Sequence, residues 1–181
     1  MYIWIGCKLP EDFEKELRSL CLSLNEDIGL STDPFNLPQH ISLKISFEAG
    51  EKQGEILAWL SAVLSQEDGF YVNLNPAERM GNILWLPVAE NPRLQALHQM
   101  LDREMETRFG IPQHPFDRCF RFHSTLFMDP DQEKLQQMHE RLKGISFDCP
   151  LAVDTFLLGI SPDGTGGSYR VIEEIKEVKI L

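Results

Sequence analysis

The chain has little positive charge. Of its 181 residues, 17 are Lys or Arg and 28 are Asp or Glu, which gives a formal net charge of −11 and a pI of about 4.9. Proteins that bind long polyanions along their surface need an excess of basic residues to neutralise the phosphates. We therefore expect no long nucleic-acid tract as a partner.

The sequence also lacks long apolar runs and closely spaced cysteines. Its longest apolar stretches, such as Ile83 to Ala89, are far shorter than the roughly 20 residues that a membrane span needs. No basic leader precedes the first apolar residues, and none of the four cysteines forms a CxxC pair. We expect neither a zinc site nor a disulfide framework, and we expect a cytoplasmic monomer without a membrane segment.

The apolar content of 43% with 25% charged residues is that of an ordinary folded protein, long enough for one large core or two small lobes. Apolar spacing predicts helices over 11–24, 51–64 and 132–142, and a helix that starts at Pro92 and ends near Gly110. Strands are predicted over 2–8, 40–47, 70–74, 83–88, 122–128, 151–160 and 169–180. The second half of this order loosely echoes the first, so we expect one α+β domain over residues 1–181, built of two similar lobes.

Two tetrapeptides share the pattern H-x-[ST]-L, and one falls in each half of the chain. They are His40-Ile-Ser-Leu43 and His123-Ser-Thr-Leu126, and both lie in predicted strands. Residues i and i+2 of a strand point to the same face. Each motif should therefore present an imidazole beside a hydroxyl, from Ser42 in the first and Thr125 in the second.

Two imidazoles that converge from opposite lobes suit displacement at phosphorus. One neutral ring can take a proton from the attacking oxygen while the other, protonated, gives a proton to the leaving oxygen. The two hydroxyls can donate hydrogen bonds to the phosphate oxygens, where negative charge must be stabilised. This scheme requires no metal and no cofactor.

With these motifs the sequence resembles the two-histidine (2H) phosphoesterase superfamily, and within it the LigT-like branch of 2′-5′ RNA ligase-like proteins and RNA 2′,3′-cyclic phosphodiesterases. The resemblance spans nearly the whole chain and includes a final loop that leads to a Tyr-containing strand. It implies that His40 and His123 are the catalytic acid and base and that Ser42 and Thr125 bind the substrate phosphate. It also implies two lobes, each an antiparallel sheet backed by helices, around a central cleft.

The resemblance further implies hydrolysis of a cyclic (2′,3′) or 2′-linked phosphodiester in a nucleotide or RNA end. Many LigT-like proteins carry a basic residue shortly after the second motif, whereas this chain has Phe127 and Met128 there. Together with the acidic net charge, this difference favours a small nucleotide or a short oligonucleotide end as the substrate.

Four more side chains are candidate substrate contacts. Lys44 has the strand parity of His40, and Arg118 and Arg121 precede the second motif, where a cation can steer a phosphate. Tyr169, like Trp85, offers an aromatic plane on which a base can stack.

Other functions fit the same residues. One alternative is a phosphodiesterase for a small cyclic metabolite, or a 2′-5′ oligonucleotide phosphodiesterase or ligase. An alternative of another class is a nucleotide- or RNA-end-binding module without catalysis. The residues leave open which histidine is the base, which ester oxygen leaves, and whether hydrolysis or ligation is the natural direction, because the same two groups serve both directions.

Overall fold

The structure of the protein is a computed structural model that describes residues 1–147 and 149–176. The described part contains four α-helices, which are α1 (Glu11–Asn25), α2 (Gln53–Leu64), α3 (Pro92–Glu104) and α4 (Gln132–Leu142). The strands are β1 (Tyr2–Lys8), β2 (His40–Ser42), β3 (Phe47–Glu48), β4 (Phe70–Val72), β5 (Glu78–Met80), β6 (Ile83–Pro87), β7 (His123–Met128), β8 (Leu151–Val153), β9 (Thr155–Ser161) and β10 (Arg170–Lys176). This is the α+β composition that the sequence predicts.

The ends of the helices follow from capping residues. The side chain of Asn91 accepts hydrogen bonds from the first backbone N–H groups of α3, and Pro92 occupies the first turn, where no N–H partner is needed. A π-helical turn (η3, Met105–Phe109) continues α3 to Gly110, whose φ of 72° is the left-handed conformation that glycine adopts at helix ends. Asp131 caps α4 in the same way as Asn91 caps α3. These ends agree with the predicted ones.

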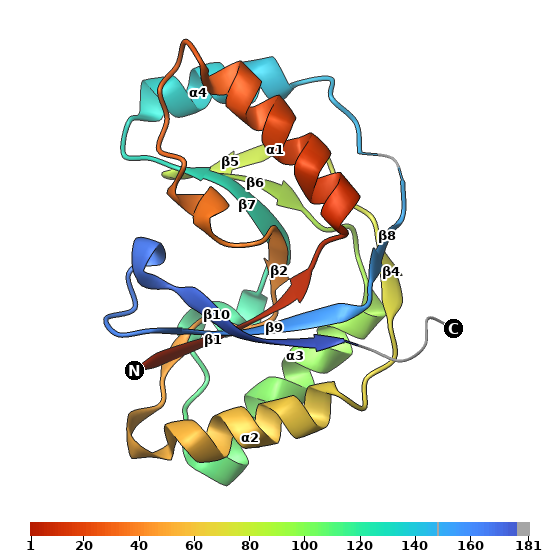
Figure 1. Ribbon diagram of the computed structural model, residues 1–181, viewed down its shortest axis with the longest axis vertical. Helices are drawn as coiled ribbons and strands as arrows, with labels where there is room; N and C mark the ends of the chain where they lie inside the picture. The colour runs from red at the N-terminus through yellow and green to blue at the C-terminus, as the bar shows by residue number, and fades with distance from the viewer. Residues whose placement is uncertain (148, 177–181) are drawn as a thin grey trace.

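All strand pairs are antiparallel, and they form two main sheets. The larger sheet has the order β10-β9-β1-β2, with β3 paired to the outer part of β1. The second sheet has the order β5-β6-β7. A short ladder of β4 and β8 lies beside them (Figure 1).

Each main sheet has its own pair of helices. Helices α2 and α3 lie on the outer side of the larger sheet, and α1 and α4 lie on the outer side of β5-β6-β7 (Figure 1). Arg141 of α4 donates to the carbonyl oxygen of Leu24 at 2.8 Å and forms an ion pair with Asp27 at 2.9 Å. Helix α1 follows β1 of the larger sheet in the chain but packs on the smaller sheet, and α3 follows β6 of the smaller sheet but packs on the larger one. Each half therefore contains a helix that is connected to a strand of the other.

Two predicted strands are interrupted in the structure, and one observed strand was not predicted. The strand predicted over 40–47 stops at Ser42 and resumes only at Phe47, and the strand predicted over 151–160 is divided into β8 and β9. The turn-rich segment before Ile83 contains β5, which the sequence analysis missed because all three of its residues are exposed and carry no apolar alternation. The last predicted strand is present as β10, and residues 177–180 of that prediction lie outside the described residues.

Most of the buried apolar side chains form one continuous cluster that includes residues of both halves. Within the described residues, none of the helices combines the length and the apolar character that a bilayer crossing demands.

Candidate active site

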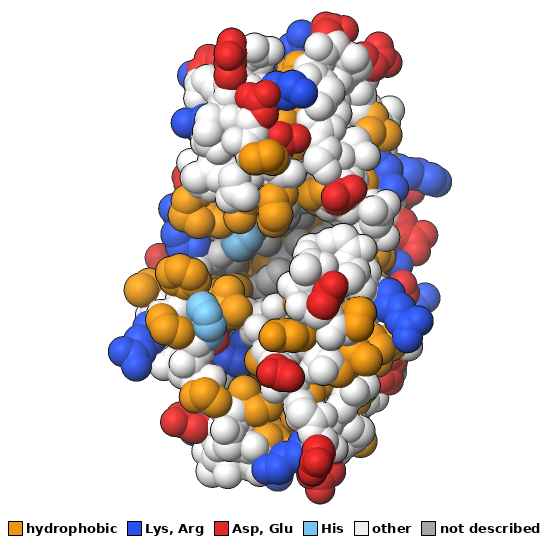
Figure 2. All heavy atoms as spheres, turned by 90° about the vertical axis from the view of Figure 1, so that its left-hand side faces the viewer, with side chains coloured by type: hydrophobic (Ala, Val, Ile, Leu, Met, Phe, Trp, Pro, Cys, Tyr) orange, Lys and Arg blue, Asp and Glu red, His pale blue; other side chains and the backbone are white. Residues whose placement is uncertain are grey.

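The two histidine motifs meet where the two halves of the molecule join. Strand β2 of the larger sheet lies against β7 of the smaller one. The Ser124 hydroxyl donates to the side-chain oxygen of Gln39 at 2.9 Å, and both side chains are buried. Figure 2 shows a hollow across the middle of this face, with a histidine side chain in it. The residues next to the two histidines thus join the two strands by a buried hydrogen bond.

Both histidine rings are held by the same backbone contact. His40 Nδ1 lies 2.8 Å from the carbonyl oxygen of Pro38, and His123 Nδ1 lies 2.6 Å from that of Arg121. A carbonyl only accepts, so Nδ1 of each ring must carry the proton and donate it. Nε2 is then left as a lone-pair acceptor in the neutral ring and as a donor in the protonated ring. This is the tautomer that a proton-transfer group needs.

The burial of the two motifs alternates as strand geometry predicts. In both motifs the histidine and the residue two places later are half-buried, and the residues between and after them are fully buried. This matched alternation means that one face of each strand is partly open and the other packs into the core. Each half therefore presents an imidazole and a hydroxyl on its open face.

A tryptophan lies against each of the two imidazoles. The ring centroids of Trp4 and His40 are 4.5 Å apart with an interplanar angle of 36°, and those of Trp85 and His123 are 4.0 Å apart with an angle of 39°. Both tryptophans are nearly fully buried. The sequence analysis considered Trp85 only as a base platform and did not single out Trp4. A signal was present, since each tryptophan lies in the strand that pairs with a histidine strand.

The environment lowers the pKa of both histidines below the usual 6.5. Burial is the main cause in each case, because removal from water disfavours the charged ring. The bond to Pro38 or Arg121 opposes this effect, and a nearby positive charge adds to it: His123 acts on His40, and Arg121 acts on His123. Both rings are therefore neutral at neutral pH in the free protein, and each protonated ring is a stronger acid than ordinary histidine.

Lys44 does not join the two motifs. The strand ends at Ser42, so the alternation that would bring Lys44 to the open face stops before it reaches this residue. Its ammonium is buried and forms ion pairs with Asp102 and with Asp117, the latter at 2.6 Å. Asp117 also accepts from the backbone N–H of Ile45 at 3.1 Å. Lys44 thus holds the chain after the first motif against the segment before the second.

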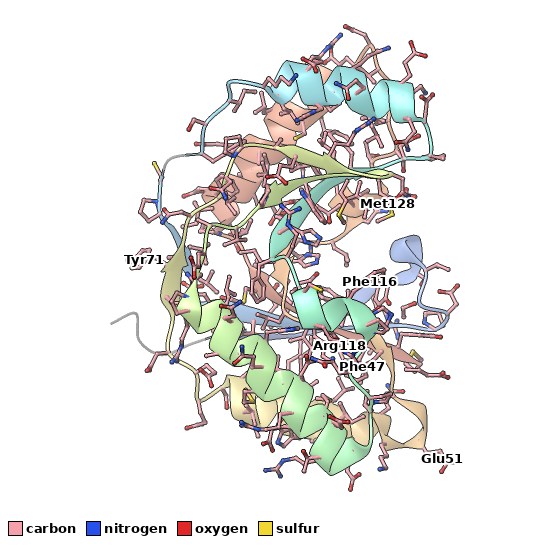
Figure 3. The ribbon with its side chains drawn as sticks, turned by 180° about the vertical axis from the view of Figure 1, so that it is seen from behind. Phe47, Glu51, Tyr71, Phe116, Arg118 and Met128 are labelled. Carbon is pink, nitrogen blue, oxygen red and sulfur yellow. The ribbon has the colours of Figure 1, made fainter. Side chains whose placement is uncertain are left out.

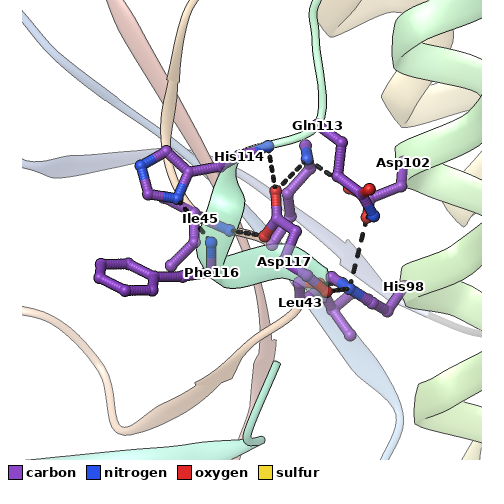
Figure 4. Close-up of polar contacts among 9 residues, drawn as sticks. Leu43, Ile45, His98, Asp102, Gln113, His114, Phe116 and Asp117 are labelled. Atoms are coloured by element: carbon purple, nitrogen blue, oxygen red, sulfur yellow. Dashed lines mark hydrogen bonds and ion pairs between the residues drawn. The ribbon is translucent and has the colours of Figure 1, made fainter. Parts of the chain in front are cut away.

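His98 belongs to the same buried cluster (Figure 4). Its Nδ1 lies 2.8 Å from the carbonyl oxygen of Leu43, and its Nε2 lies 2.9 Å from that of Asp117. The ring thus lies between two backbone carbonyls, one on each side of the cluster. His98, Asp102 and Asp117 are also close enough together to ligate a metal ion, but the Lys44 ammonium contacts both carboxylates. Both carboxylates are therefore already paired with Lys44.

The other candidate contacts differ in their exposure. Arg121 is exposed, pairs with Glu78 at 2.7 Å and lies over the Trp85 ring at 5.5 Å, next to His123. Arg118 is exposed on the short helix η4 (Pro115–Cys119). Tyr169 is half-buried, and its ring meets the Trp4 ring edge to face at 6.5 Å between centroids. Arg121 and Tyr169 thus lie beside the histidine–tryptophan pairs.

Two exposed apolar side chains flank the opening between the halves. Phe116 on η4 is 72% exposed and Met128 at the end of β7 is 42% exposed. Figure 3 shows them on opposite sides of this opening. Sequence reasoning missed Phe116, because an isolated aromatic in a Pro-containing loop carries no pattern.

Known structures share this arrangement of two halves. TT0787 of Thermus thermophilus superposes with a TM-score of 0.70 at 19% identity over 97% of both chains. LigT of E. coli in complex with 3′-AMP gives a TM-score of 0.64 at 21% identity over 98% of both chains. Usb1 of Kluyveromyces marxianus gives 0.56 at 10% identity over 97% of both chains. The fold is that of the LigT-like two-histidine phosphoesterases.

The sequence itself identifies the family. The profile of the 2′-5′ RNA ligase superfamily matches residues 13–164, which include both histidine motifs. This chain belongs to the 2′-5′ RNA ligase superfamily, and the resemblance seen in its motifs is confirmed. No curated protein sequence matches it. Because this superfamily consists of phosphoesterases and ligase-like enzymes, membership in it supports the prediction that this protein is an enzyme.

Proposed function

We propose that this protein is a phosphodiesterase that opens a cyclic (2′,3′) or 2′-linked phosphodiester of a nucleotide or RNA end, with His40 and His123 as its acid–base pair. The observation that carries the proposal is the duplicated geometry of the two rings. Each donates Nδ1–H to a backbone carbonyl, has no hydrogen-bond partner at Nε2 among the described residues and has a hydroxyl-bearing residue two places further along the same strand.

The reaction needs both protonation states at once. In hydrolysis of a cyclic phosphate, a neutral imidazole accepts a proton at Nε2 from the water that attacks phosphorus. The opposite imidazolium donates its Nε2 proton to the ribose oxygen as the P–O bond breaks. The product is a phosphomonoester, and the two rings have exchanged roles. With the 5′-hydroxyl of a second RNA end in place of water, the same two groups would catalyse ligation, and the product would be a phosphodiester.

The hydroxyls of Ser42 and Thr125 complete the site. Each donates a hydrogen bond to a non-bridging phosphate oxygen, where negative charge must be stabilised in the transition state. The phosphate anion also raises the pKa of the histidine that stays protonated, because an opposite charge nearby favours the imidazolium. Substrate binding thus offsets the effect of burial on one of the rings.

The charges around the site favour a short substrate. Two of the candidate cations are already neutralised, Lys44 by buried aspartates and Arg121 by Glu78. A long RNA strand needs a row of free cations, whereas a mononucleotide or a short RNA end needs only the central phosphate site. LigT of E. coli, which shares the fold, was crystallised with 3′-AMP and with ATP, which supports a nucleotide as the ligand class.

The test is hydrolysis of the nucleoside 2′,3′-cyclic monophosphates and of short RNAs that end in a 2′,3′-cyclic phosphate, with EDTA present. We expect turnover that falls about 10²- to 10⁴-fold in His40→Ala and in His123→Ala, the usual contribution of an acid–base group. Ser42→Ala and Thr125→Val should reduce turnover less. The ratio of 2′- to 3′-phosphate product shows which ester oxygen leaves.

Other outcomes reject the proposal in different ways. If either histidine variant keeps more than a few per cent of the wild-type rate, that ring is not an acid–base catalyst. If the substrates bind without turnover, the protein is a nucleotide-binding module. If only small cyclic metabolites react, the site is catalytic but the substrate class is another one.

A further inference from the structure

The two tryptophans beside the catalytic rings are not equivalent by position. In the larger sheet Gly6 pairs with Ser42, whereas in the smaller sheet Trp85 pairs with Thr125. Trp85 therefore occupies the position that corresponds to Gly6. Trp4 lies two residues before Gly6 in β1, and its side chain reaches over Gly6 to His40.

Two glycines make this reach possible. A Cβ atom on Gly6 would lie 2.8 Å from Trp4 Cζ3 and 3.0 Å from His40 Cδ2. A Cβ atom on Gly159, which pairs with Trp4 from β9, would lie 1.8 Å from Trp4 Nε1. The Trp4 indole thus lies flat across the backbone of β1 and β9, where any side chain would displace it. The smaller sheet needs no such glycines, because Trp85 starts from the position opposite Thr125.

Core packing alone does not account for these two side chains. Neither indole N–H has a hydrogen-bond partner among the described residues, although both are buried. Burial of an unpaired N–H is unfavourable, and Phe or Leu would fill a core position without it. What an indole adds is a wide flat face, and in both halves this face lies against a motif imidazole.

We propose that Trp4 and Trp85 are positioning residues for the two-histidine reaction, each acting as a flat support that fixes the plane of its imidazole and aims Nε2 at the phosphate. This inference rests on the proposed function. If the contact were only a remnant of duplication, the two tryptophans would occupy corresponding positions. They do not, so the shared contact indicates a requirement of the site.

The support has two physical effects. A ring held at Nδ1 by a carbonyl can still swing about that bond, and the indole face removes this freedom. The indole also shields one imidazole face from water and offers its electron-rich face to the protonated ring. Of the charged neighbours, Lys8 pairs across from His40 and is bound to Glu174, and Arg121 beside His123 is bound to Glu78.

Intrinsic fluorescence tests the contact without any substrate, because a protonated imidazole in contact with an indole quenches its emission. The chain has three tryptophans, and the third, Trp59, packs against Phe109 far from the motifs. In Trp59→Phe/Trp85→Phe the emission of Trp4 should fall as the pH is lowered through the titration of His40. His40→Asn in that background should abolish this step. Trp59→Phe/Trp4→Phe with His123→Asn is the matching pair for Trp85.

Kinetics test the consequence. Trp4→Phe and Trp85→Phe keep an aromatic face and should stay within about fivefold of wild-type kcat, whereas Trp4→Leu and Trp85→Leu should lose about 10- to 100-fold, the usual cost of a misplaced catalytic group. In the Leu variants the acidic and basic limbs of the pH–rate profile should also move. Trp59→Leu is the control and should change neither kcat nor the profile.

The two readouts separate the inference from the proposed function. Emission that stays flat from neutral pH down to the onset of acid unfolding in both single-tryptophan proteins, or a step that survives His→Asn, contradicts the contact. Leu variants with wild-type kcat and an unmoved profile contradict the positioning role. A clear fluorescence step in a protein that turns over no phosphodiester contradicts the proposed function instead, and with it the role of positioning for catalysis.

Discussion

The two halves of the site share three features and differ in what surrounds them. Around His40 and around His123 alike there are a carbonyl clamp on Nδ1, a hydroxyl two residues on and an indole face. The first half is backed by glycines and by the buried Lys44 cluster, whereas the second carries the exposed Arg121–Glu78 pair over Trp85. The shared features are those that proton transfer to and from a phosphodiester needs, and the differing ones anchor or tune each half.

The largest expected difference between the halves is in stability. Lys44→Met leaves Asp102 and Asp117 buried without their cation. We expect the free energy of unfolding to fall by about 3–5 kcal/mol, the usual cost of removing one partner of a buried ion pair. Arg121→Met removes an exposed pair and should change stability by less than about 1 kcal/mol. Urea unfolding at pH 7 measures both.

Equal effects of these two substitutions would contradict the contrast between a buried anchor and a solvated pair. A Lys44→Met protein as stable as wild type would mean that the cluster is no anchor for the segments that carry the two motifs.

A smaller difference is expected for the glycines. Gly159→Ala places a methyl group where the Trp4 indole lies, and overpacking of this kind costs about 1–3 kcal/mol. Gly54→Ala in α2 is the matched control, since a Cβ there meets no described atom within 4 Å and alanine is the better helix former. Thermal unfolding should show a lower Tm for Gly159→Ala and an unchanged or higher one for Gly54→Ala. Equal changes in Tm for the two variants would contradict the role of Gly159 in leaving room for the Trp4 indole.

The smallest effect sharpens the electrostatic contrast. Arg121 holds the pKa of His123 down by its positive charge, after burial. In Arg121→Gln the pKa of His123 should therefore rise toward 6.5, while the pKa of His40 should change little, since burial, the bond to Pro38 and His123 act there and Arg121 does not. NMR titration of the two imidazoles, assigned with the His→Ala variants, measures this. A fall of the His123 pKa, or an equal rise for both rings, would contradict it.

Local pattern was enough to predict most of the fold and both motifs. The bounds of β1 and α4 agree with apolar spacing and capping residues, and the paired H-x-[ST]-L pattern located the four residues at the centre of the proposed site. Alternation of exposure along a strand is a property of a few neighbouring residues, so it can be read from one segment alone.

The supports of the site could not be predicted in this way, because they join residues that are distant in the chain. Lys44 had the parity of a cleft residue, but the strand ends at Ser42 and two aspartates far along the chain draw the ammonium inward. Trp4 reaches His40 only because Gly159 of β9 leaves room for it. Such contacts depend on sheet order and register, which the pattern of a single segment does not contain.

The central claim is that two imidazoles, one in each half, share one proton in the active state. The most direct test is the pH dependence of kcat/KM on a nucleoside 2′,3′-cyclic monophosphate, with EDTA present, for wild type, His40→Ala and His123→Ala. Burial lowers the pKa of both rings, so the account predicts a bell-shaped profile with its maximum on the acid side of pH 6.5. The value of kcat/KM should fall as the pH rises through 6.5, and both variants should lose turnover. A rate that stays constant or rises through pH 7, or a bell that survives either substitution, would contradict it.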